Sequence, residues 1–202
     1  MNRLLKIVLG GAALLLTPLG VGLAALQTPA ASASQPVPFA GIPGVERLSY
    51  DVSGASVAAI RRSIDNHPER PRDPNDGLRV DALANWYMRW SWPAGPSGGC
   101  DLARARIQFS ARVTMPRLLN ERLVPAPVLA RWRAYLDALE RHEDGHVRYA
   151  FDHMGEVLAA IRASSCARAN DDARAVIQRI GRHDIDYDRE TDHGTLQGAR
   201  FP

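Results

Sequence analysis

The chain has only two cysteines, a single lysine and almost no excess of charge. Its 25 basic and 22 acidic side chains nearly cancel. No basic stripe is interleaved with aromatic residues, which argues against a nucleic acid as partner. Every basic residue except Lys6 is an arginine, a bias that we attribute to genome composition. The chain also lacks internal repeats, and 202 residues suffice for one domain with its own core.

The N-terminus predicts export. Arg3 and Lys6 precede an uncharged apolar run from Ile7 to Leu26, and Ala31-Ser32-Ala33 forms an A-x-A cleavage site. This arrangement predicts a Sec-type signal peptide over residues 1–33, and hence a secreted or periplasmic protein. The alternative is an uncleaved membrane anchor, because an apolar run of this length can just span a bilayer.

The two cysteines, Cys100 and Cys166, predict a disulfide, because an exported protein meets an oxidising compartment. Such a bridge would close the loop over residues 101–165 and stabilise the fold by about 4 kcal/mol in the chain-entropy model. Zinc ligation by the two thiolates is the alternative, which their wide spacing disfavours.

The most informative stretch is His142-Glu143-Asp144-Gly145-His146, an HExxH motif. Histidines at positions i and i+4 of an α-helix project from one face and can share one Zn²⁺. Glu143 would lie beside the metal, where it can take a proton from water. The motif therefore supplies two metal ligands and the general base of a zinc-dependent hydrolase. The competing interpretation is a solvated helix face with two incidental histidines.

The flanks of the motif predict one long amphipathic helix, because apolar and motif residues recur every three or four positions. They are Leu129, Trp132, Leu136, Leu139, Glu143, His146, Ala150, Met154, Val157 and Ile161. Since Glu143 and His146 lie on this stripe, we expect them to face the interior or a cleft. A carboxylate and an imidazole placed there need a partner, which a metal provides.

The extended pattern HExxHxxGxxH would require glycine at position 149 and histidine at 152. The chain has Tyr149 and Asp152 there. Without the glycine we expect the helix to continue, with Asp152 and His153 on its surface.

A catalytic zinc site usually has three protein ligands, so one more is needed. The segment 187–199 is polar and punctuated by glycine, with no clear helical or strand period, which predicts a loop. From this loop His193 is our first choice for the third ligand, beside a glycine that lets the backbone bend. Asp188, His183 and Glu190 are the alternatives.

The HExxH motif and the later pattern YDxxTxHGxxQGA, here Tyr187 to Ala199, together resemble a bacterial family of predicted secreted zinc-dependent peptidases. That family is catalogued as a domain of unknown function. The likeness also covers residues 50–54, the tryptophan-rich stretch 86–92 and the cysteine pair, and so extends from about residue 45 onward. The resemblance implies a peptidase assignment.

The remaining pattern predicts an α+β order. Residues 34–46 are rich in proline, glycine and alanine and predict a flexible lead-in to one domain over 47–202. Residues 47–52 predict a strand and 56–64 a short helix, while the proline-rich stretch 67–77 predicts a surface loop.

Two longer stretches alternate between apolar and polar residues and predict strands of an antiparallel hairpin, at 86–92 and 103–115. We expect their apolar face to pack on the metal-binding helix. The tryptophans of the first strand predict a core stripe, with a carbohydrate platform as the alternative. A short last helix is predicted at 173–180.

These features predict an α+β, zincin-like fold in which an antiparallel sheet packs on the long HExxH helix. We expect an exported zinc peptidase that acts on peptides or proteins, with His142, His146 and His193 holding Zn²⁺ and Glu143 as general base.

Tyr187 and Asp188 are further candidates, for contact with a developing oxyanion or for support of the metal ligands. A membrane is a partner only if the signal is retained, and the oligomeric state is not indicated. The alternative functions are a zinc-stabilised, non-catalytic binding module and a zinc amidase that acts on cell-wall peptides.

Overall fold

The computed structural model describes residues 37–96 and 98–202, so the signal peptide expected over 1–33 lies outside the described residues. The fold is α+β, with a small three-stranded sheet. In chain order the elements are β1 (Val45–Val52), α1 (Val57–Asp65), β2 (Leu83–Ser91), β3 (Arg106–Leu118), α2 (Ala126–Asp152), α3 (Met154–Arg162) and α4 (Ala169–Thr191). Within the described ranges no helix combines the length and apolarity needed to cross a bilayer.

The sheet has the order β1-β3-β2. The expected hairpin is confirmed, because β2 runs antiparallel to β3, with Trp86 opposite Ala111. The sheet as a whole is mixed, not antiparallel as predicted, since β1 pairs in parallel with β3. A parallel pair needs a long connection, which α1 and β2 provide here. The alternation within one strand carries no information about the direction of its neighbour, so this pairing was missed.

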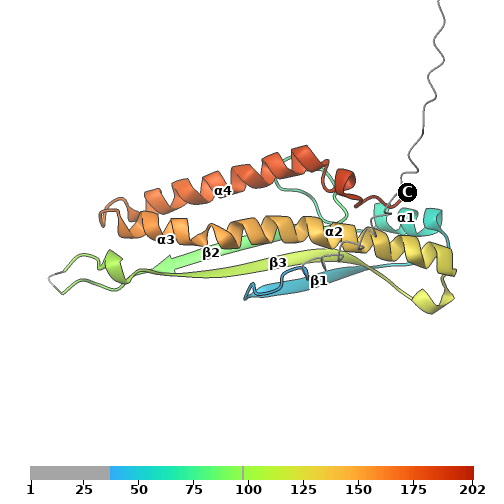
Figure 1. Cartoon of the computed structure of the whole chain (residues 1–202), viewed down its shortest axis with the longest axis horizontal. Helices are drawn as coiled ribbons and strands as arrows, with labels where there is room; N and C mark the ends of the chain where they lie inside the picture. The colour runs from blue at the N-terminus through green and yellow to red at the C-terminus, as the bar shows by residue number, and fades with distance from the viewer. Residues whose placement is uncertain (1–36, 97) are drawn as a thin grey trace, which may run out of the picture. The chain divides into compact units, whose positions relative to one another are not determined.

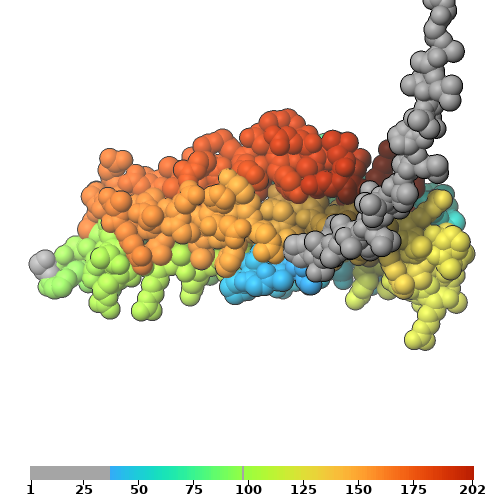
Figure 2. All heavy atoms as spheres, viewed as in Figure 1, coloured from blue at the N-terminus to red at the C-terminus, as the bar shows by residue number. Residues whose placement is uncertain are grey.

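Helices α2 and α3 pack on one face of the sheet, and α4 lies on the same side and packs on α3 and α2 (Figure 1). In the space-filling view the atoms of α4 lie directly against those of α2 and α3 (Figure 2). Val147 of α2 packs on Ala111 and Val113 of β3, as the strand pattern predicted. The side chains of Trp86 and Trp90 pack on the core shared with α3 and α4, so the tryptophan stripe faces the helices.

The HExxH helix is interrupted at His153, where we expected it to continue. The backbone of His153 has φ −92° and ψ 1°, and its ring Nδ1 lies 2.7 Å from the carbonyl oxygen of Tyr149. The apolar stripe nevertheless continues into α3, with Val157 and Ile161 fully buried. Periodicity reports the buried face, which the break preserves, and therefore does not reveal the break.

The last helix is much longer than predicted. Helix α4 spans Ala169–Thr191, so the first part of the segment expected to be a loop is helical. Buried Val176 and Ile180 are followed at the same spacing by Asp184 and Asp188. Because carboxylates continue the inward face of α4, the apolar period stops while the helix does not.

The described part of the expected lead-in, from residue 37, is also structured. Phe39 and Ile42 are buried against Val147 of α2, and the backbone N–H of Phe39 donates to Asp144. Two apolar side chains among prolines and glycines are too few to show a period, which is why this packing was not predicted.

Asp81, just before β2, joins the sheet to the helices. Its carboxylate accepts hydrogen bonds from Arg61 of α1 (2.6 Å) and Tyr135 of α2 (2.7 Å), and Arg70 forms a further ion pair with it. Burial alone would raise the pKa of this carboxyl, but these bonds hold the pKa below its ordinary value.

The predicted disulfide between Cys100 and Cys166 is present, with the two Cα atoms 5.7 Å apart. It connects the segment before β3 to the turn between α3 and α4. Neither cysteine belongs to the HExxH motif or to the segment 187–199, so we assign the bridge a role in stability.

Candidate metal centre

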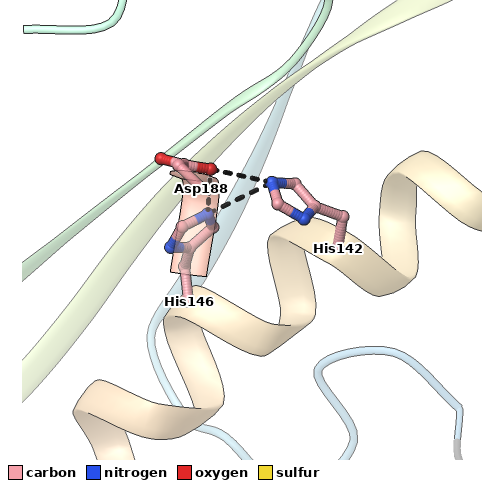
Figure 3. Close-up of side chains that lie close together, drawn as sticks. All are labelled: His142, His146 and Asp188. Atoms are coloured by element: carbon pink, nitrogen blue, oxygen red, sulfur yellow. Dashed lines mark hydrogen bonds and ion pairs between the residues drawn. The ribbon is translucent and has the colours of Figure 1, made fainter. Parts of the chain in front are cut away.

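Three ligating side chains converge between α2 and α4 (Figure 3). His142 and His146 project from one face of α2, one turn apart, and Asp188 faces them from α4. Oδ1 of Asp188 lies 3.0 Å from Nε2 of His142 and 3.1 Å from Nε2 of His146, and the two nitrogens are 3.3 Å apart. Both histidines are more than nine-tenths buried.

These separations fit a tetrahedral metal site. Zinc–nitrogen and zinc–oxygen bonds of about 2.0–2.1 Å place neighbouring ligand atoms about 3.3 Å apart at tetrahedral angles. The three distances between the ligating atoms lie close to that value. The residues therefore could hold a divalent cation such as Zn²⁺ with little movement of the helices.

The outer ring nitrogens of both histidines have acceptors. Nδ1 of His146 lies 3.2 Å from Oδ1 of Asp184, and Nδ1 of His142 lies 3.0 Å from Oε1 of Gln197. An ionised carboxylate only accepts hydrogen bonds, so Nδ1 of His146 carries a proton. When both rings are neutral and carry their protons on Nδ1, each Nε2 lone pair faces Asp188. The two Nε2 atoms and Oδ1 of Asp188 are then three acceptors that converge at one point. Such an arrangement needs a proton or a metal ion between them.

Further contacts hold these supporting groups in place. Trp86 of β2 donates from Nε1 to the second oxygen of Asp184 at 2.6 Å. Nε2 of Gln197 donates to the hydroxyl of Tyr187 at 2.9 Å, and the Tyr187 ring stacks on His142. Tyr187, predicted as an oxyanion donor or a supporting residue, therefore contacts a metal-ligand candidate and its orienting amide.

Two glycines make this packing possible. A Cβ on Gly145 would lie 2.6 Å from the hydroxyl oxygen of Tyr187, and a Cβ on Gly194 would lie 2.8 Å from Cγ of His142. Gly194 also has a positive φ of 79°, which glycine adopts without strain. Both glycines belong to the sequence motifs, and close approach to the candidate site explains each of them.

The electrostatics of the site favour positive charge. Burial disfavours a charged imidazole, but hydrogen bonds to Asp184 and Asp188 outweigh it and raise the pKa of His146 to about 10. Burial also opposes ionisation of Asp188, yet hydrogen bonds from His142 and His146 hold its pKa below the ordinary value. A field that stabilises a proton here would also stabilise a divalent cation.

Glu143 is buried, with 4 % of its surface exposed, and lines the same pocket as the two histidines. Burial raises the pKa of its carboxyl, partly opposed by the neighbouring histidines and by a backbone hydrogen bond from Ala84. The pocket has a volume of about 390 Å³ and runs along the start of β2. Strand β2 lines this pocket and is an edge strand of the sheet, whereas β3 is central.

The other predicted ligands lie at different distances from this cluster. Nδ1 of His193 lies 3.6 Å from Oδ1 of Asp188, and His193 groups with Asp188 and Asp73. His183, although on α4, stacks on Tyr149 and belongs to neither group of ligating atoms among the described residues. Glu190 is exposed.

Sequence reasoning missed Asp184 and Asp73, and assigned no role to Gln197. Asp184 lies one helical turn before Asp188, so recognising α4 as helical would have placed both on one face. Asp73 comes from the loop predicted to lie on the surface, but only 4 % of it is exposed. No local signal distinguishes it from the exposed acidic residues of the same loop.

The fold and this cluster define an α+β protein with a histidine–carboxylate site that could hold a metal ion. The chain belongs to a bacterial protein family of unknown function, DUF922, whose model matches residues 48–194. The family description names no activity. No curated protein and no solved structure matches the chain.

Proposed function

We propose that this protein is an exported zinc-dependent peptidase in which His142, His146 and Asp188 hold the metal and Glu143 is the general base. The observation that carries the proposal is the convergence of three ligating atoms at tetrahedral spacing beside a buried glutamate in a pocket. Asp188 takes the place of the third ligand because its Oδ1 lies 3.0 and 3.1 Å from Nε2 of His142 and His146, whereas His193 groups with Asp73 and Asp188.

A zinc ion bound there supplies Lewis acidity, which polarises a scissile carbonyl and lowers the pKa of water. Glu143 accepts the proton of the attacking water as its oxygen bonds to the carbonyl carbon. When the C–N bond breaks, Glu143 returns this proton to the departing amine, so the carboxylate is regenerated. The raised pKa of Glu143 brings its basicity closer to neutral pH, which suits a group that both accepts and donates.

The supporting residues keep this arrangement ready. Asp184 and Gln197 hold the Nδ1 protons, so that both Nε2 atoms face the metal position. The edge of β2 along the pocket favours an extended peptide as substrate, since an edge strand offers backbone groups for strand addition.

The test compares Glu143→Gln with the wild type, both as full-length zinc-loaded proteins. Hydrolysis is measured on a denatured protein, a peptide library and muropeptides, and zinc content by mass spectrometry. We expect Glu143→Gln to keep its zinc and to lose about 10²- to 10⁴-fold in hydrolysis, because only proton transfer is removed. Asp137→Asn, an exposed carboxylate-to-amide change on the same helix, is the matched control and should retain full activity.

Each other outcome has a defined meaning. If the wild-type protein binds no zinc, the proposal is wrong. Zinc-loaded wild type that cleaves no substrate in the panel supports a zinc-stabilised binding module instead. Cleavage of muropeptides alone assigns the site to a cell-wall amidase. Full activity of Glu143→Gln contradicts the role of this residue as base.

A further inference from the structure

A second group of ligating atoms adjoins the first. Asp73, Asp188 and His193 each offer one atom, and these atoms all lie within 4.8 Å of one another. Asp188 is common to both groups, and its Oδ1, which faces the two motif histidines, lies 3.6 Å from Nδ1 of His193. A carboxylate shared in this way is the usual bridge between paired metal ions about 3.5–4 Å apart.

Asp73 supplies an independent reason to expect a cation. It is 4 % exposed and lines the pocket. One oxygen accepts the backbone N–H of Asn75 at 2.7 Å, and among the described residues no basic side chain is paired with it. The pocket arginines are engaged elsewhere, because Arg70 pairs with Asp81 and Arg79 donates to a backbone oxygen. A buried carboxylate with one neutral donor requires further compensation.

His193 is held toward this place by an unusual backbone. Asp192 and His193 both have positive φ, 51° and 48°, in a chain segment that ends α4. Its Nε2 lies 3.5 Å from Asp76, which leaves Nδ1 facing Asp188. A histidine with its outer nitrogen at a carboxylate and its inner nitrogen at the site has the arrangement of a supported metal ligand.

We propose that Asp73, Asp188 and His193 form a second divalent-metal position, bridged by Asp188 to the first. The inference rests on the proposed function for the first position. One imidazole and two carboxylates suit zinc or manganese, and the second site has fewer imidazole ligands than the first, so it binds Zn²⁺ more weakly. The pocket then presents two cations to a substrate, one on each side of Asp188.

Zinc binding to chelator-stripped, full-length protein tests this proposal, measured by titration calorimetry and by native mass spectrometry. We expect two zinc ions per wild-type chain, and one in Asp73→Asn. Asparagine at position 73 can still accept the N–H of Asn75, so the loop keeps its turn while the charge is lost. Glu190→Gln removes an exposed carboxylate from α4 and should keep both ions.

A stoichiometry of one in the saturated wild type overturns the second position and leaves the proposed function standing. A stoichiometry of zero overturns both. Two ions in the wild type with two remaining in Asp73→Asn and in His193→Gln place the second ion elsewhere and also overturn the inference. Circular dichroism of each variant shows that a lost ion does not result from a lost fold.

Discussion

The contact between Asp184 and His146 allows a sharp test of how the site is held. Asp184 accepts hydrogen bonds at both oxygens, one from Trp86 and one from the Nδ1 proton of His146. The substitution Asp184→Asn leaves one acceptor for two donors. If the amide oxygen faces Trp86, the NH₂ group faces Nδ1, and the proton of the His146 ring must move to Nε2, where it blocks metal binding.

Loss of an orienting partner of this kind typically lowers metal affinity by about 10- to 100-fold, which corresponds to about 1.4–2.8 kcal/mol. We expect Asp184→Asn to fall in this range in a competition titration of Zn²⁺ against a chromophoric chelator. Asp186→Asn, an exposed change half a turn away on α4, should bind zinc like the wild type.

A double-mutant cycle with Trp86→Phe separates orientation from simple loss of charge. Without the indole N–H, the amide oxygen of Asn at position 184 is free to face His146. The cost of Asp184→Asn should therefore shrink in the Trp86→Phe protein, with a coupling energy of about 0.5–3 kcal/mol. Equal costs in both backgrounds, or zinc affinity within twofold of the wild type in Asp184→Asn, would refute the orientation argument.

Three further predictions concern stability, measured by urea unfolding. Gly145→Ala should destabilise the protein because the added methyl group displaces Tyr187. In a Tyr187→Ala background the same change should stabilise the protein by about 0.8–1.0 kcal/mol, because alanine has the higher helix propensity. A change in unfolding free energy of the same sign in both backgrounds would contradict this explanation. The pKa of Asp81 in the folded protein is below the ordinary 3.8, so its contribution to the free energy of unfolding is present above about pH 4 and is lost as the pH falls through the folded pKa. The difference in stability between the wild type and Asp81→Asn should therefore shrink from pH 7 to pH 3. A constant difference would contradict this role of the Asp81 carboxylate. Replacing Cys100 and Cys166 by serine should lower the free energy of unfolding by about 4 kcal/mol, because the unfolded chain without the bridge gains loop entropy. A decrease below about 1 kcal/mol would contradict this, and would show that the unfolded chain is constrained even without the bridge.

Secondary structure was predicted correctly from the sequence where the apolar residues follow the period of one kind of element. The period of α2 placed Glu143 and His146 on its buried face, and the alternation of the two long strands predicted their pairing. Prediction from hydrophobic periodicity failed where polar residues occupy the inward face of an element. The carboxylates Asp184 and Asp188 end the apolar period of α4, although they continue its buried side.

What the sequence determined by itself is local: a pair of histidines one turn apart, a glutamate between them, the strands beneath them, and a cysteine pair that forms the disulfide. Only the tertiary structure decided which carboxylate meets the histidines and which groups orient their rings. Asp73, Asp184 and Asp188 reach the pocket from a loop and a helix far from the motif in sequence. Their convergence depends on how α4 packs against α2 and β2, and no short-range pattern encodes that packing.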